Sequence, residues 1–119
     1  MSDEIIYIDM GTVSMLMDAL EDEYFEIIEI FISTSRERIA EMVSKSSAST
    51  EDLLDVVHVL KGSSGNVGAI HLSNVCNELE SMLRSGSVDG IDSMIQDIEV
   101  SFDVTCKVFQ EIINGKYNA

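Results

Sequence analysis

The sequence predicts an all-α protein, and three observations support that fold class. The chain contains no proline, which would interrupt a helix, and only seven glycines in 119 residues. Apolar residues recur every three or four positions almost from end to end, as on the buried face of a helix. No segment alternates apolar and polar residues between the tight turns of a β-hairpin. We therefore expect an antiparallel up-down four-helix bundle with a short additional N-terminal helix.

The first two helices follow from their apolar positions. The short N-terminal helix carries Ile8, Val13, Leu16 and Leu20 on one face. A longer helix is expected from about Asp22 to Ser46, and the serine-rich stretch from Ser44 to Thr50 forms the turn after it. The apolar stripe of this second helix comprises Phe25, Ile28, Phe31 or Ile32, Ile39, Met42 and Val43.

The third helix begins with a strong N-terminal signal. Ser49 or Thr50 can cap it, and two acidic residues follow in the first turn, where they favour the positive end of the helix dipole. We expect it to run to about Val67, because Gly68 can adopt the left-handed conformation that ends a helix. Its stripe comprises Leu53, Val56, Val57, Leu60, Ser64 and Val67.

Two further helices complete the bundle. The fourth ends near Gly86, the turn Asp89-Gly90 follows, and the fifth runs from Ile91 to about Gly115. The stripe of the fourth comprises Leu72, Val75, Cys76, Leu79, Met82 and Leu83, and that of the fifth Met94, Ile95, Ile98, Phe102, Thr105, Val108, Phe109 and Ile112. A chain of this length has room for one hydrophobic core, so we expect a single domain over residues 1–119, and a monomer.

The charge balance excludes several classes of partner. Twenty-two acidic residues against seven basic ones give a formal net charge of −15, which repels nucleic acid and anionic membrane surfaces. The N-terminus is acidic where a secretion signal would be basic, and no long apolar run occurs, so we expect a cytoplasmic protein. Cys76 and Cys106 are expected to be reduced core residues.

His58 is the candidate functional residue of the third helix. At about 100° per residue its side chain lies roughly 140° from the centre of the apolar stripe, on the solvent side. Gly62 and Gly65 lie on the same outward face, and since a helical glycine costs about 1 kcal/mol relative to alanine, the pair indicates close approach of a partner. Lys61 can bring a cation to the ring, and Ser63 can add a hydrogen bond. Imidazole is a good nucleophile, so the pattern favours phosphoryl transfer over an ordinary surface histidine.

The string from His58 to Ala69, HVLKGSSGNVGA, closely resembles the motif of histidine-containing phosphotransfer (HPt) domains, in which a histidine is followed by Lys-Gly, a small residue and a further glycine, here His58, Lys61, Gly62, Ser63 and Gly68. Further along the chain the resemblance continues at Leu72, Cys76, Leu79 and Glu80, and in the N-terminal part at Ile8-Asp9 and Phe31. It implies an up-down four-helix bundle whose exposed His58 accepts phosphate from an aspartate of one receiver domain and passes it to another.

The resemblance also assigns roles to the neighbours of His58. Lys61 looks like the charge partner, Gly62 and Gly65 like the clearance for docking, and Gly68 like the residue that lets the chain turn. The implied partners are the receiver domains of a hybrid sensor kinase and of a response regulator. No cofactor of the chain itself is implied, because the receiver domain supplies the Mg²⁺.

One position departs from the family pattern. Asp55, one turn before His58, stands where members of the family often have a basic or neutral residue. Its charge should weaken the binding of acidic partners or select a receiver with a complementary cation. Arg84 would offset this charge if the third and fourth helices are neighbours.

Three alternatives compete with a phosphohistidine carrier. A kinase needs a nucleotide site, but the sequence has no P-loop and no G-x-G-x-x-G stretch, so we expect no autokinase activity. A metal bundle would need the Asp55-x-x-His58 element twice and facing inward, and His71 reads as an ordinary exposed residue, so we expect no metal. A non-catalytic adaptor that only binds receivers remains the alternative, although an intact His58 argues against it.

Overall fold

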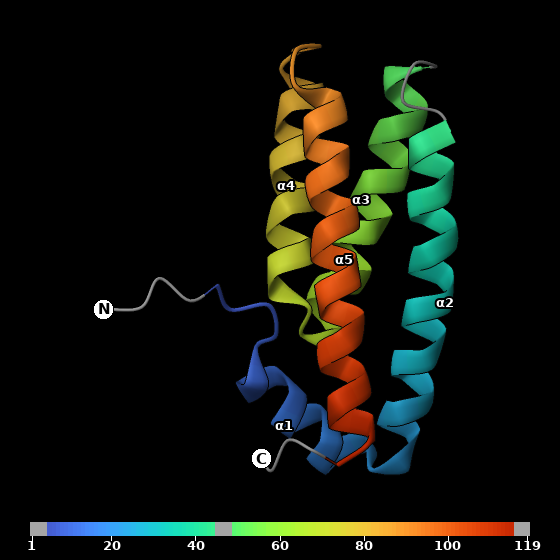
Figure 1. The fold of residues 1–119 in the computed structure, drawn as a ribbon, viewed down its shortest axis with the longest axis vertical. Coiled ribbons are helices and arrows are strands. Elements are labelled where there is room, and N and C mark those ends of the chain that lie inside the picture. The colour runs from blue at the N-terminus through green and yellow to red at the C-terminus, as the bar shows by residue number, and fades with distance from the viewer. Residues whose placement is uncertain (1–4, 45–48, 116–119) are drawn as a thin grey trace.

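The computed structural model describes residues 5–44 and 49–115, and it confirms the all-α fold with helices and no strand in these residues. The elements in chain order are α1 (Met10–Leu20), α2 (Asp22–Ser44), α3 (Thr50–Val67), α4 (Ile70–Arg84) and α5 (Ile91–Ile113). Helices α2 to α5 run alternately up and down the long axis of the molecule, and the short α1 lies at one end (Figure 1). This is the up-down bundle with an additional N-terminal helix.

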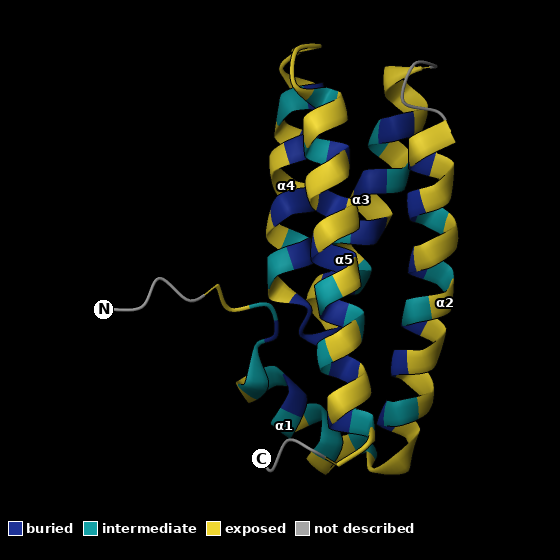
Figure 2. Ribbon diagram, in the orientation of Figure 1, coloured by how far each residue is buried: buried dark blue, intermediate teal, exposed yellow. Residues whose placement is uncertain are grey.

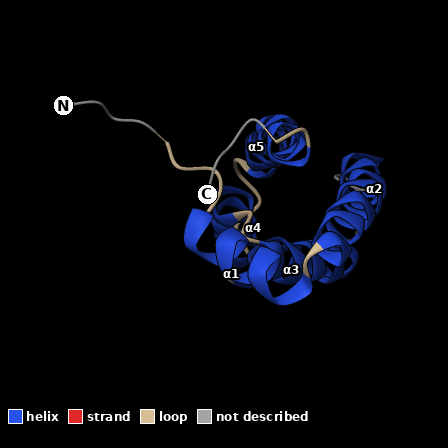
Figure 3. Ribbon diagram, turned by 90° about the horizontal axis from the view of Figure 1, so that it is seen from below, coloured by secondary structure: helices blue, strands red, loops and turns tan. Residues whose placement is uncertain are grey.

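The order of the helices around the bundle brings α3 and α4 together. Their contact is the most extensive in the fold, and α4 also packs on α5, and α3 on α2. In the view along the bundle, α3 and α4 lie between α2 and α5 (Figure 3). Between the described parts of α3 and α5 there is no close backbone contact, so these two helices lie diagonally across from each other.

The apolar stripes form one core between the helices (Figure 2). Phe31, and not Ile32, is the buried member of its pair, and its ring meets the edge of Phe109 on α5 at 6.1 Å between centroids. Val43 was expected in the core but is exposed, because the neighbouring Met42 takes the buried position of that turn. The largest fully buried side chains include Tyr24, Phe109, Ile28, Met42, Leu60, Leu72, Leu79 and Ile98.

The helix ends follow the expected signals with small shifts. Ser49 caps α3 by accepting a hydrogen bond from the Asp52 N–H at 3.1 Å. Gly68 ends α3 in the left-handed conformation, at φ 91°. Helices α4 and α5 each stop two residues before the expected glycine, and α2 ends at Ser44; the expected end at Ser46 and most of the turn after it lie outside the described residues.

The N-terminal segment packs against the turn between α3 and α4. The Asp9 N–H donates to the Gly68 carbonyl at 2.8 Å, and a Cβ atom on Gly68 would lie 3.3 Å from Val13 Cγ2. From the start of α2, the buried Tyr24 hydroxyl donates to the Val67 carbonyl at 3.1 Å. Burial raises the pKa of Tyr24 to about 12, so the phenol keeps its proton and remains a donor. These contacts fix the C-terminal end of α3.

The remaining histidine is not the exposed residue that the sequence suggested. His71 is half-buried at the start of α4, where its Nδ1 lies 2.7 Å from Ser101 Oγ, and its ring contacts that of Tyr7 at 4.4 Å between centroids with the two planes tilted by 43°. The expectation was wrong because α5 and the N-terminal segment both cover this position. His71 therefore contributes to the packing between α4, α5 and the N-terminal segment.

Both cysteines are free thiols. Cys76 is fully buried, whereas Cys106 is only half-buried at the edge of the core. Burial, with a smaller contribution from Glu80, raises the pKa of Cys76 to about 12, so this thiol is not a nucleophile at neutral pH. No helix in the described residues is both long and apolar enough to span a membrane.

Candidate functional site

His58 lies near the middle of α3 and faces solvent, with 61% of its side chain exposed. The ring is nevertheless held in place, because Nδ1 lies 2.7 Å from Oε2 of Glu80 on the neighbouring helix α4. The other ring nitrogen, Nε2, has no hydrogen-bond partner in the described residues. The Nδ1 edge of the imidazole is thus held by Glu80, and the Nε2 edge is available to a reaction partner.

Glu80 is the centre of the site. Only 5% of its side chain is exposed, and both carboxylate oxygens are occupied by donors. Oε1 accepts a hydrogen bond from Lys61 Nζ, and Oε2 accepts one from Arg84 Nη2 at 2.9 Å in addition to its contact with His58. Hydrogen bonds from Lys61 and then Arg84 lower the pKa of Glu80 to about 2, against the opposing effect of burial. The carboxylate is therefore ionised at neutral pH.

The ionised carboxylate fixes the tautomer of the neutral His58 ring. A carboxylate without a proton can only accept hydrogen bonds, so Nδ1 must be the nitrogen that carries the hydrogen. The lone pair of the neutral ring is then on Nε2, the nitrogen without a partner. This arrangement, an oriented imidazole whose donor edge rests on a carboxylate, presents a nucleophilic nitrogen at the surface.

The two glycines beside His58 have different surroundings. Gly62 is exposed, and a Cβ atom there would meet nothing within 4 Å, so its backbone is bare surface. A Cβ atom on Gly65 would lie 3.4 Å from Ser73 Oγ, and that hydroxyl donates to the Lys61 carbonyl at 3.0 Å. Gly65 therefore also allows α4 to approach α3, a role that the sequence did not indicate.

The remaining residues that the sequence predicted for the site do not contact the Glu80 carboxylate. Ser63 is half-buried, and its hydroxyl donates to the Leu60 carbonyl of its own helix at 3.3 Å. Gly68 lies in the turn at the end of α3. Asp55 is exposed one turn before His58, on the same side of α3. The structure thus brings together His58 and Lys61, with Gly62 beside them.

Glu80 is the functional residue that sequence reasoning left without a role. Its position belongs to the buried face of α4, between the core residues Leu79 and Leu83. An acidic residue on an apolar face signals a paired charge, because a carboxylate is almost never fully buried without partners. That signal was available in the sequence, but the identity of the partners depends on how α3 and α4 align.

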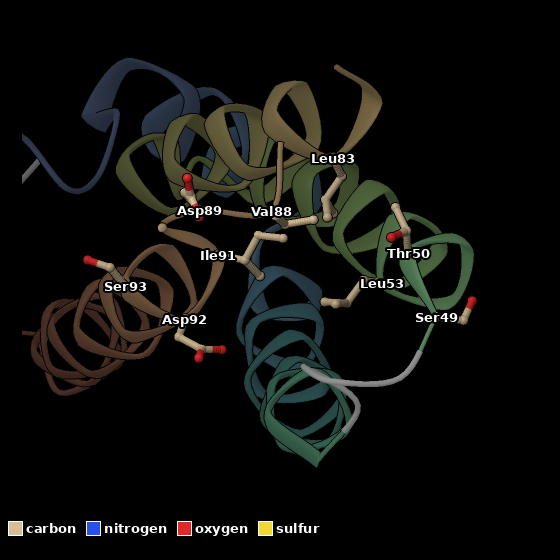
Figure 4. A pocket seen from close by; sticks show the side chains of 10 residues that line it. Ser49, Thr50, Leu53, Leu83, Val88, Asp89, Ile91, Asp92 and Ser93 are labelled. Carbon is tan, nitrogen blue, oxygen red and sulfur yellow. The ribbon is translucent and has the colours of Figure 1, made fainter. Parts of the chain in front are cut away.

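The site lies on an open surface of α3 and α4. Among the described residues, no group of three or more His, Cys, Asp or Glu side chains could hold a metal ion. A pocket of about 410 Å³ lies at the end of the bundle where α3 begins, with Leu53, Leu83, Val88 and Ile91 among its lining residues, and it contains none of the site residues (Figure 4). The exposed His58 imidazole lies outside this pocket and is accessible to a macromolecule.

The chain belongs to the Hpt family, since residues 26–112 match the model of the Hpt domain. The matched region includes His58, Lys61 and Glu80. The chain is therefore a phosphotransfer protein of two-component phosphorelays. Proteins of the Hpt family interact with receiver domains. No curated protein matches the chain.

Solved structures show the same fold. The crystal structure of histidine-containing phosphotransfer protein B from Pseudomonas aeruginosa PAO1 is similar with a TM-score of 0.88 and 27% identity, covering 97% of this chain and 100% of that one. A putative histidine-containing phosphotransfer protein from rice has a TM-score of 0.77 and 22% identity, covering 91% and 80%. The maize protein ZmHP2 also has a TM-score of 0.77 and 22% identity, covering 91% and 83%. The two plant proteins support the fold alone.

Proposed function

We propose that this protein is a phosphorelay intermediate that carries a phosphoryl group on Nε2 of His58. It accepts the group from the phospho-aspartate of one receiver domain and passes it to the aspartate of another. The observation that carries this proposal is the contact of Nδ1 with the ionised Glu80, which leaves the lone pair on an exposed Nε2. Membership of the Hpt family supports the same class of reaction.

The transfer step needs little movement of protons on this chain. The Nε2 lone pair forms the N–P bond while the P–O bond of the aspartyl phosphate breaks, and its electron pair leaves with the aspartate. The hydrogen on Nδ1 stays in place, so the ring gains positive charge next to Glu80, 2.7 Å away. A fixed anion at the point where positive charge develops stabilises the transition state and the phosphorylated ring. Transfer to the second receiver reverses these changes.

The neighbours of His58 take supporting roles in the proposal. Lys61, bound to Glu80 and 29% exposed, is the nearest cation of α3 for the phosphoryl oxygens. Gly62 and Gly65 provide the low surface on which a receiver docks, and Ser63 lies at its flank. Gly68 shapes the turn at the end of α3. The Mg²⁺ that assists phosphoryl transfer is expected to come with the receiver domain.

A transfer assay separates a carrier from an adaptor. A receiver domain phosphorylated with ³²P is incubated with the wild-type protein, with His58→Gln, and with His71→Gln as the control for the other histidine. We expect acid-labile, base-stable label on wild type and His71→Gln, no label on His58→Gln, and loss of the label when a second receiver is added. ATP and Mg²⁺ alone should label none of them. A wild-type protein that binds the receivers but never takes up label would be an adaptor.

A further inference from the structure

Positive charge is scarce in this chain and gathers beside His58. The sequence has seven Lys and Arg residues against 22 Asp and Glu residues. Five of the seven lie in the described residues, because Lys45 and Lys116 fall outside them. Two of these five, Lys61 and Arg84, bind the carboxylate that holds the His58 ring. The site is therefore an exception to the acidic surface of the molecule.

Arg84 reaches the site from α4, outside the motif on α3. Its Nη2 binds the same Glu80 oxygen that contacts His58 Nδ1, so the guanidinium lies within two hydrogen-bond lengths of the ring. The side chain is 61% exposed, and this is the one hydrogen bond that it makes within the described residues. Four of its five N–H groups thus remain open to solvent or to an incoming anion.

The four charges around the neutral ring cancel. Lys61 and Arg84 contribute two positive charges, and Glu80 and Asp55 two negative ones. Without Arg84 the surroundings of His58 would carry one net negative charge. A phosphoryl group brings a charge of about −1.5 to −2 to the same place, so the uncompensated anion would oppose its arrival.

We propose that Arg84 offsets the charge of Asp55 and thereby determines how readily the site accepts an anionic phosphoryl donor. This inference rests on the proposed phosphotransfer at His58. Arg84 acts as a specificity-determining residue for anionic donors, through its charge at the rim of the site. Its contribution to folding is limited, because the Arg84 side chain is itself exposed and the buried Glu80 carboxylate keeps Lys61 and His58 as partners when Arg84 is removed.

The expected effect follows from Coulomb's law at the surface. At the dielectric constant of bulk water, removing one charge at about 8 Å from a group of charge about −1.5 to −2 slows phosphorylation by roughly fourfold to sixfold at low salt. The change should diminish at about 1 M salt, where the Debye length falls to about 3 Å.

The test uses phosphoramidate, a small anionic donor that needs no partner protein. The donor's P–N bond breaks and releases ammonia as the Nε2–P bond forms, and uptake is followed by mass spectrometry of the intact protein. The variants are Arg84→Gln, Arg84→Lys, Asp55→Asn and the double variant Asp55→Asn with Arg84→Gln. Lys107→Gln is the matched control, because it changes the net charge equally on α5, the helix diagonal to α3.

The relative phosphorylation rates of the variants test the role of Arg84. We expect Arg84→Gln to be roughly fourfold to sixfold slower than wild type, Asp55→Asn to be faster, and the double variant to return to within about twofold of wild type. Arg84→Lys and Lys107→Gln should stay close to wild type. Equal rates for Arg84→Gln and wild type, an equal loss in Lys107→Gln, or no rescue by Asp55→Asn would overturn it. Failure of wild type to be phosphorylated at all would instead count against the proposed function.

Discussion

Replacing Glu80 with glutamine tests the contact on which the site is built. The variant keeps the shape of the side chain but removes the charge that faces His58 Nδ1 and accepts from Lys61 and Arg84. A hydrogen bond to a charged group contributes about 1.5 to 3 kcal/mol. If most of this stabilises the positive ring formed by attack of Nε2, phosphoryl transfer should fall by roughly tenfold to a hundredfold.

The matched control for this variant is Glu78→Gln. Glu78 lies on the same helix and is exposed, so its replacement changes the net charge by the same amount away from the His58 ring. Both variants are compared with wild type in single-turnover transfer from a phosphorylated receiver, with receiver affinity measured separately by titration. Glu80→Gln should lose rate with little change in affinity, and Glu78→Gln should resemble wild type. Equal transfer rates in Glu80→Gln and wild type would refute the reasoning.

The same substitution should alter the response to acid. The folded-state pKa of Glu80 is about 2, below its ordinary value of 4.5, so the unfolded chain takes up the proton first. The stability that the carboxylate contributes is therefore fully present above about pH 5 and is lost as the pH falls toward about 2. We expect the difference in unfolding free energy between wild type and Glu80→Gln to shrink over this range in urea titrations. A constant difference would show that Glu80 is not stabilised as an anion.

Four further substitutions test single residues. His58→Gln should abolish phosphorylation while leaving helical circular dichroism and the melting temperature nearly unchanged, because the side chain is exposed. Gly68→Ala should lower the free energy of unfolding in urea by about 1 to 3 kcal/mol, because Gly68 has a left-handed backbone and a Cβ atom there would crowd the N-terminal segment. Gly62→Ala should raise the free energy of unfolding by up to about 1 kcal/mol, because Gly62 lies within a helix and a Cβ atom there would meet open space. Tyr24→Phe should cost about 1 to 3 kcal/mol by leaving the buried Val67 carbonyl without its donor.

The helices and the outward direction of His58 could be predicted because both depend on local periodicity. The apolar stripe of α3 places the ring on the solvent side without knowledge of any other helix. The role of Glu80 could not be predicted, since it requires the alignment of α4 against α3, which sets the residue opposite His58. His71 was misjudged for the same reason, because its cover comes from α5 and from the segment around Tyr7.

Gly65 has two roles, and the sequence indicated only one of them. Two glycines on one exposed face suggested a single purpose, yet only Gly62 has open space where a side chain would stand. The approach of Ser73 to Gly65 comes from the packing of two helices that are close in sequence but whose crossing geometry is not encoded in periodicity. Local patterns give the faces of helices, and tertiary packing decides which atoms meet there.

In the proposed mechanism, Nε2 of His58 carries the phosphoryl group while Nδ1 keeps its hydrogen and its contact with Glu80. A long-range ¹H–¹⁵N correlation spectrum of the protein labelled with ¹⁵N-histidine, recorded before and after phosphorylation by phosphoramidate, tests it directly. We predict that the free protein shows His58 with Nδ1 protonated, and that phosphorylation moves the Nε2 signal alone to the position of a phosphorylated nitrogen. Phosphorylation at Nδ1 of His58, or at either nitrogen of His71, would contradict the account.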